Sequence, residues 1–166
     1  MKRSKKKKRP TIKFDIRECI GSTEKKKAWK NFSKYHYLTA DLNMAARVYV
    51  GYVNDDIACF SAVLPQPQLP DTFRISRSVV LPDYQGIGLS NRMSEFLGEE
   101  YNKGYKILTG TTTHPGLIKQ RMNSDRWKIT AFDKSVGVTH NFDKNELNNR
   151  LKASFRYVPI KENKLW

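Results

Sequence analysis

The stretch VVLPDYQGIGLSNRM, residues 79–93, decides what this chain folds into. An apolar run ends at Pro82, two glycines follow as Gly86 and Gly88, and a helical pattern of apolar residues begins directly after them. The unpaired N–H groups at the start of a helix attract anions, and glycine lets a phosphate approach the backbone without meeting a Cβ atom. We therefore expect a strand, a phosphate-binding turn and a helix in this order.

Two common nucleotide-binding motifs do not fit this turn. The dinucleotide-binding motif needs a third glycine, where the sequence has Asn91, and an acidic residue about 20 positions further on. Residues 106–108, which stand there, are Lys, Ile and Leu. The P-loop motif needs Gly-Lys-Ser/Thr after its first glycine, and Asn91 and Arg92 do not supply it. The sequence therefore argues against both kinds of nucleotide site.

The flanking sequence predicts one α/β or α+β domain with a mixed sheet. The helical pattern of residues 89–104 lies between the strand patterns of residues 73–81 and 105–113, and so close a succession predicts a parallel strand pair. Period-two alternation and turn residues predict further strands at 11–19, 47–53, 57–64, 126–132 and 153–159. Helical spacing predicts helices at 22–38, 41–48 and 116–124, with a proline-rich loop at 65–71 and a polar segment at 142–150.

The chain is strongly basic. Its net charge is +15, and the opening residues MKRSKKKKRP carry seven basic side chains and no acidic one. Such a block of like charges repels itself, so we expect residues 1–10 to form a disordered tail in front of a folded domain at 11–166. The tail has three interpretations: a solubilising or targeting segment, a contact for nucleic acid phosphates, or a contact for a membrane surface.

The remaining bulk features favour a cytoplasmic protein. No apolar run approaches the ~20 residues that a membrane-spanning helix needs, and the charged start is not followed by the apolar segment of a secretory signal. Cys19 and Cys59 are the two cysteines, which excludes a disulfide framework. The three histidines show no metal-ligand spacing, so we expect no metal site. Oligomeric state stays open between a monomer and a homodimer.

The glycine turn resembles the acyl-CoA-binding signature of the GNAT superfamily of N-acyltransferases, whose pattern is Gln/Arg-x-x-Gly-x-Gly/Ala. Gln85, Gly86, Ile87, Gly88, Leu89 and Ser90 fill this pattern in order, with the serine at the small last position. The order of elements is also similar over most of residues 11–158, although only residues 79–93 are specific. The resemblance implies a mixed central sheet with two splayed parallel strands, flanked by helices.

The resemblance also implies how a donor, acetyl-CoA or another acyl-CoA, would bind. The N–H groups from Gly86 to Ser90 would hold its pyrophosphate. The strand end at residues 79–81 (Val79, Val80 and Leu81) would hold the pantetheine arm, with Val79 and Leu81 pairing through their backbones. The thioester would lie where this strand splays from the next one, around residues 108–111.

The residue that usually protonates the leaving thiolate in this superfamily is missing from the sequence. Many relatives place a tyrosine in the helix after the splayed strands, whereas this sequence has Met122 and its neighbours there. His36 can accept a proton near neutral pH and Tyr37 can donate one, or both side chains pack in the structure. His114 lies near the expected splay, and could instead hold its loop by a hydrogen bond. A weaker resemblance to phage-type GNAT proteins that modify DNA bases implies the same pair, His36 and Tyr37.

The charge and the aromatic residues favour a nucleic acid as acceptor, either a modified DNA base or an amine carried on tRNA. Aromatic side chains such as Tyr35, Tyr37, Trp127 and Trp166 suit a base taken out of its stack. If the chain is encoded by a phage, it would act in the host cytoplasm. The alternatives are an acetyltransferase for a small amine or a protein amine, and a nucleic-acid-binding module without catalysis.

Overall fold

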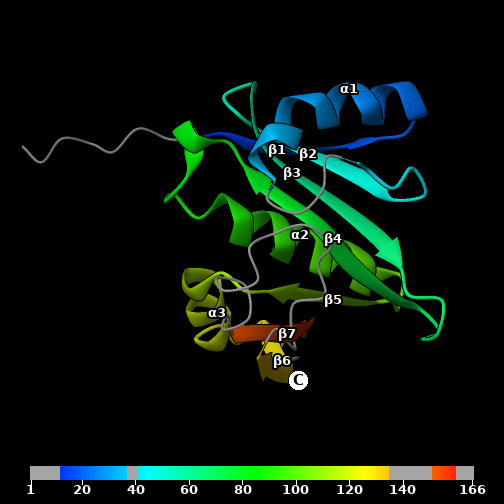
Figure 1. Cartoon of the computed structure of the whole chain (residues 1–166), viewed down its shortest axis with the longest axis vertical. Coiled ribbons are helices and arrows are strands. Elements are labelled where there is room, and N and C mark those ends of the chain that lie inside the picture. The colour runs from blue at the N-terminus through cyan, green and yellow to red at the C-terminus, as the bar shows by residue number, and fades with distance from the viewer. Residues whose placement is uncertain (1–11, 37–40, 135–150, 160–166) are drawn as a thin grey trace, which may run out of the picture.

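The computed structural model describes residues 12–36, 41–134 and 151–159, and these form one mixed sheet with helices on both faces (Figure 1). The strands are β1 (Phe14–Cys19), β2 (Arg47–Val53), β3 (Asp56–Pro65), β4 (Thr72–Val80), β5 (Ile107–Thr112), β6 (Trp127–Lys134) and β7 (Leu151–Tyr157). The helices are α1 (Ser22–Phe32), α2 (Leu89–Lys103) and α3 (Pro115–Met122), with short 3₁₀ turns η1 (Ser33–Tyr35) and η2 (Pro82–Tyr84). None of the helices described is both long and apolar enough to cross a membrane.

The sheet runs in the order β1-β2-β3-β4-β5-β7-β6. Only β4 and β5 are parallel, and α2 connects them; the other neighbours are antiparallel. All seven predicted strands and the predicted parallel pair are therefore confirmed. The fold class, a mixed sheet flanked by helices, is confirmed with them.

The two parallel strands diverge, as expected, and an extra residue in β4 gives the physical cause. Backbone pairing of β4 with β5 covers only the first four residues of β4 and ends at Ile75 opposite Gly110. Against β3, Val63 pairs with Ile75 but Ala62 pairs with Arg77, so Ser76 is an extra residue in β4. A bulge of this kind bends its strand and increases its twist. The strands consequently lie together where they begin and separate toward their carboxyl ends (Figure 1).

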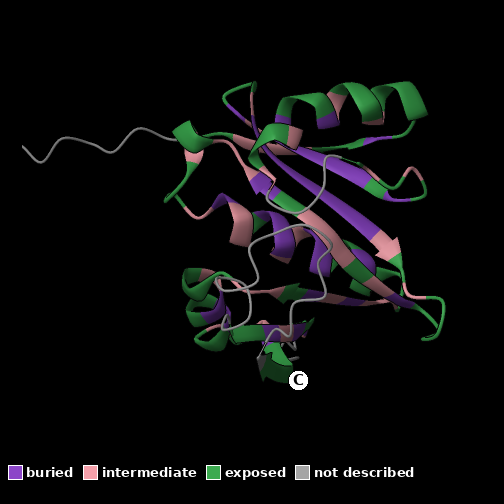
Figure 2. Ribbon diagram, in the orientation of Figure 1, coloured by how far each residue is buried: buried purple, intermediate pink, exposed green. Residues whose placement is uncertain are grey.

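Each face of the sheet has its own core (Figure 2). On one face α1 packs Trp29 and Phe32 against Phe60 of β3, with ring centroids 5.0 and 5.3 Å apart. On the other face α2 buries an apolar stripe, and the strands, α2 and α3 contribute one continuous cluster. The buried stripe of α2 is Leu89, Met93, Ser94, Leu97, Gly98 and Tyr101.

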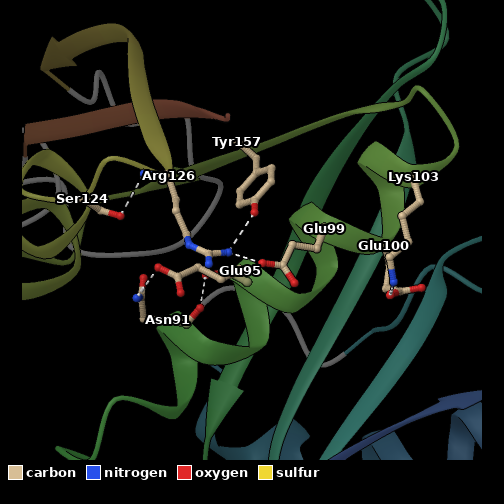
Figure 3. A network of polar contacts seen from close by, with 9 residues as sticks. Asn91, Glu95, Glu99, Glu100, Lys103, Ser124, Arg126 and Tyr157 are labelled. Atoms are coloured by element: carbon tan, nitrogen blue, oxygen red, sulfur yellow. Dashed lines mark hydrogen bonds and ion pairs between the residues drawn. The ribbon is translucent and has the colours of Figure 1, made fainter. Parts of the chain in front are cut away.

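The packing of α2 against β7 holds this helix to the far strands of the sheet. Gly98 lets the ring of Tyr157 lie directly on the helix, because a Cβ at this glycine would be 2.3 Å from the ring. Arg126, just before β6, forms an ion pair with Glu99 of α2 and donates a hydrogen bond of 3.1 Å from Nη1 to the Tyr157 hydroxyl (Figure 3). The helix is thereby held to the far strands, with its first residue at the end of the turn that follows β4.

Two predictions about local structure differ from the observed fold. The predicted helix at 41–48 is wrong: a turn occupies this region and β2 begins at Arg47. Asn43 explains it, because its side-chain oxygen accepts from the Ala45 amide and its carbonyl oxygen accepts from the Ala46 amide, both at 3.0 Å. An asparagine side chain that bonds nearby backbone in this way competes with helix formation.

The predicted helix at 22–38 is also too long. It ends at Phe32 and continues as a 3₁₀ turn to Tyr35. The basic segment 1–10 and the polar segment 142–150 lie outside the described residues, so their predictions stay untested.

Candidate functional site

The glycine turn between β4 and α2 is open on the side where a ligand would approach. Gly86 and Gly88 have φ angles of +81° and +84°, in the left-handed region that favours glycine. Among the described residues, no atom lies within 4 Å of the position that a Cβ would take at either glycine. The two glycines are therefore needed for the backbone conformation, and the described part of the chain does not fill the space in front of them.

The first turn of α2 presents N–H groups that the helix does not use. Gly88 is the N-cap residue and has no side chain to cap the helix. The amide of Arg92 is bonded to the Gly88 carbonyl at 3.1 Å, so the amides of residues 89–91 come before the first intrahelical hydrogen bond. The first turn contains no acidic residue. A 15-residue helix with such a start attracts an anion.

Gln85 attaches the turn to the end of β4. Its side-chain Nε2 donates to the Val80 carbonyl oxygen at 3.1 Å. The turn η2, which opens with Pro82, carries the chain from the strand to this glutamine. Tyr84, which ends η2, packs against the core under α2. The conformation of the glycine turn is thus fixed from the strand side.

The open backbone edge of β4 is formed by Ser78 and by the N–H group of Val80, whose carbonyl oxygen already accepts from Gln85. The Leu81 amide donates to the Ala58 carbonyl of β3 at 2.9 Å, and Val79, two residues earlier, faces β3 in the same way. The N–H and C=O groups of Ser78 and Val80 therefore point to the other side, from which β5 has diverged. This corrects the expectation that Val79 and Leu81 offer their backbones to a ligand. Their side chains pack in the core under α1 instead.

His36 lies beside β4 on the face of the sheet that α1 covers. Its ring makes an edge contact with Trp29, with centroids 5.7 Å apart. Burial lowers the pKa of His36 below the ordinary value, and the nearby positive charge of Arg77 lowers it further. The imidazole is therefore neutral at pH 7 and able to accept a proton. Tyr37 lies outside the described residues, so its role stays a prediction.

His114 is a helix cap. Its Nδ1 accepts a hydrogen bond of 3.2 Å from the Leu117 amide at the start of α3. This supports the interpretation that it holds its loop in place. In the described parts of the chain, no three His, Cys, Asp or Glu side chains lie close enough together to hold a metal ion.

Arg121 of α3 was missed by the sequence analysis. Its side chain is 4% exposed and lies over the rings of Trp127 and Phe155, at 4.4 and 5.5 Å from their centroids. Burial lowers the pKa of Arg121 to about 10. The available signal was its spacing of three from Ile118, which places a basic residue on the buried face of the helix. Met122, in the region where relatives carry a tyrosine, is 57% exposed.

A cavity of about 250 Å³ lies at the opposite, carboxyl-terminal end of α2. Three of the four charged side chains that line it are in ion pairs, Arg47 with Glu18 at 2.7 Å and Glu100 with Lys103, and the fourth, Lys106, lies over the ring of Phe73. Burial raises the pKa of Tyr101, whose hydroxyl lies 3.5 Å from that of Tyr49. Because these groups satisfy one another, we do not assign the reaction to this cavity.

Similarity to known proteins is found in the fold and not in the sequence. No protein-family model matches the sequence, and no curated protein matches it. Among solved structures, the IAA acetyltransferase of Bacillus cereus is 16% identical with a TM-score of 0.65, and the match covers 88% of this chain and 100% of that one. The ribosomal-protein-S18-alanine N-acetyltransferase of Escherichia coli is 13% identical with a TM-score of 0.63, covering 93% and 99%.

A third structure, a GNAT family acetyltransferase of Elizabethkingia anophelis with acetyl-CoA bound, is 12% identical with a TM-score of 0.59. The match covers 86% of this chain and 96% of that one. The chain therefore has the fold of the GNAT acetyltransferases, as residues 79–93 led us to expect. The weaker phage-type resemblance is not represented among these structures.

Proposed function

We propose that this chain is an N-acyltransferase that uses an acyl-CoA, most simply acetyl-CoA, as donor. The observation that carries the proposal is the open turn at Gly86 and Gly88, which joins diverging strand β4 to the free N–H groups of α2. The fold adds support, because a protein of the same fold has been solved with acetyl-CoA bound.

In this proposal the N–H groups from Gly86 to Ser90, with Ile87 and Leu89 between them, bind the pyrophosphate. Gln85 holds the turn in shape through its bond to Val80. The backbone of Ser78 and the N–H group of Val80 bond the pantetheine arm in the space left by β5, and the side chains of Val79 and Leu81 support that edge from the core.

The donor supplies an acyl group already activated as a thioester, so the protein mainly positions the partners and moves protons. The attacking amine must be neutral, and an adjacent base that is itself neutral can take its proton. His36 meets this requirement because its pKa is lowered. We assign proton acceptance to His36 and, from the sequence, proton donation to Tyr37.

We further propose that the acceptor amine belongs to a nucleic acid or is carried on one. The net charge of +15 supports this, because a basic surface gains affinity for phosphates by releasing their counterions. A basic protein also repels polyamines and other cationic acceptors. Small amines and protein amines are the competing acceptors.

Gly88→Ala tests the donor site. A Cβ at φ +84° strains the turn by about 1–2 kcal/mol and projects into the space left for the pyrophosphate. We expect calorimetry to show acetyl-CoA binding to the native protein and at least tenfold weaker binding to the variant. Tyr105→Ala is the matched control: this residue also has a positive φ, of 58°, and lies 95% exposed beyond the other end of α2.

The same pair of proteins tests the acceptor. Mass spectrometry of DNA and RNA from cells that express the native protein should show an added acyl mass, and the Gly88→Ala cells should lack it. If small amines or proteins are acylated while DNA and RNA stay unmodified, the proposal of a nucleic acid acceptor is rejected. If the native protein does not bind acetyl-CoA even at millimolar concentration, the chain is a binding module and not this enzyme.

A further inference from the structure

Arg121 is a buried cation without a negative partner. Its side chain is 4% exposed, and within the described residues it makes no ion pair and no side-chain hydrogen bond. Arg47 and Arg126, by contrast, each pair with a glutamate. Buried charges in proteins are normally paired, because an unpaired one loses its hydration without compensation.

The guanidinium of Arg121 lies over Gly110 of β5, at the end of the pairing between β4 and β5. Its Nη1 is 3.0 Å from the position that a Cβ would take at Gly110. Gly110 is the last residue of β5 that pairs with β4, opposite Ile75. Beyond this pair the strands diverge, and the proposed donor site begins. The cation therefore lies over β5 next to the point where the gap opens, and a side chain at position 110 would displace it.

Two buried donors meet here without an acceptor. Arg121 Nε and Trp127 Nε1 are both buried and have no hydrogen-bond partner among the residues that the structure describes, and the two side chains are in contact. The rings of Trp127 and Phe155 offset part of the cost of burying the charge, but neither provides an acceptor lone pair. One anionic atom entering the gap would satisfy the charge and a donor together.

We propose that Arg121 binds the sulfur of the donor as negative charge develops on it during acyl transfer. This inference rests on the proposed function. In the step concerned, the amine nitrogen bonds to the carbonyl carbon, the carbon–sulfur bond breaks, and its electron pair stays on sulfur as a thiolate. The amine proton leaves to the base. A guanidinium that pairs with the thiolate stabilises the leaving group without having to protonate it.

An anionic group at this end of the donor has two sources: the thiolate, or a carboxylate on the acyl chain. Every acyl-CoA releases a thiolate, whereas only donors made from dicarboxylic acids carry the carboxylate. We therefore assign Arg121 to the thiolate, and the experiment separates the two sources.

The test measures binding and the ionisation of the bound thiol in the full-length protein. Coenzyme A and its desulfo analogue are titrated by calorimetry over a pH series, and thiolate absorbance gives the pKa of the bound thiol. The variants are Arg121→Met, which removes the charge, and Arg121→Lys, which keeps a charge without the planar donor set. Lys119→Met removes an exposed positive charge from the same helix and is the control.

In the native protein and in Lys119→Met we expect a lowered pKa for the bound thiol. Coenzyme A should then bind about tenfold or more tightly than the desulfo analogue once the thiol ionises. In Arg121→Met this preference should disappear while the desulfo analogue binds as before, and Arg121→Lys should fall between. Circular dichroism establishes that each variant is folded.

Three results would overturn the proposal. An unchanged thiol pKa and an unchanged preference in folded Arg121→Met would reject it while leaving the donor site intact. A preference for succinyl-CoA over acetyl-CoA that is lost in Arg121→Met, with no effect on the thiol, would place a carboxylate there instead. If neither coenzyme A nor acetyl-CoA binds the native protein, the proposed function fails and this inference fails with it.

Discussion

His36 combines partial burial with a positive neighbour, and both effects act in the same direction. Desolvation is the larger cause and Arg77 the second, and each favours the neutral imidazole. The pKa therefore lies below the ordinary value of about 6.5. Because the neutral form accepts the proton, turnover should rise as pH is raised through the lowered pKa and be level at pH 7.

His36→Gln should lower kcat by about 100-fold or more while leaving acetyl-CoA affinity within a factor of two, because a general base contributes that much to the rate and nothing to donor binding. Steady-state kinetics and calorimetry measure the two effects. The acidic limb of the native pH–rate profile should have an apparent pKa below 6.5 and be absent from the variant. His114→Asn, which preserves a helix-capping side chain, should keep the limb. A native profile that is flat down to pH 5 would return His36 to a packing role.

Some residues of the site can be predicted from the sequence and others cannot. The role of Gly86 and Gly88 could be predicted because a left-handed backbone conformation favours glycine, and two closely spaced glycines are visible in the sequence. The backbone direction of Val79 could not, because it depends on the extra residue Ser76 and on pairing with β3. A role for Arg121 could not be assigned for a similar reason, because it depends on how β6 and β7 place Trp127 and Phe155 against the guanidinium.

Among the elements, α2 links the site to the rest of the sheet. Gly98 lies in its middle, where helix propensity favours alanine by about 1 kcal/mol. A Cβ there would stand 2.3 Å from Tyr157, a ring held by a 3.1 Å hydrogen bond from Arg126 and by edge contact with Trp127. Overpacking of this kind costs about 1–3 kcal/mol. The clash should outweigh the propensity.

Gly98→Ala should therefore lower Tm by several degrees, since about 1 kcal/mol corresponds to 2–4 °C in a protein of this size. Thermal unfolding followed by circular dichroism measures it. Gly104→Ala provides the comparison, because a Cβ there would have its nearest contact at 3.6 Å and should change Tm little. A higher Tm for Gly98→Ala would show that Tyr157 moves aside and that this contact does not fix the position of α2 on the sheet.

The predicted helices and strands are confirmed where the spacing of apolar residues and the positions of turn residues indicate the same boundaries. The hairpin of β2 and β3 was expected from two alternating runs around Asn54 and Asp55, and both residues adopt positive φ in the turn. The helix predicted before β2 is absent because the Asn43 side chain bonds the nearby backbone in place of a helical hydrogen bond. The spacing of apolar residues carries no information about this competition.

At the scale of the whole molecule, the two sides of β4 serve different partners in the proposed reaction. Val79 packs under α1, next to the core that also contacts His36 through Trp29. Arg121 reaches the end of the strand pair from the α2 and α3 side. The base for the amine and the cation for the thiolate would then act from opposite faces of one sheet. This arrangement depends on sheet order and strand divergence, so no local pattern could reveal it.

The charge of the molecule is uneven along the chain. Deleting residues 2–9 removes seven of its positive charges and leaves a net charge of +8. If these residues contact phosphates, the deletion should weaken binding to duplex DNA. It should also reduce the slope of log Kobs against log salt concentration by up to about 6, because each neutralised phosphate contributes about 0.9. Fluorescence anisotropy with a labelled duplex over a salt series measures both.

A chain of native length with serine at the seven basic positions separates charge from length and should behave like the deletion. Equal slopes for all three proteins would assign DNA contact to the remaining charges and leave the first ten residues a solubilising or targeting role.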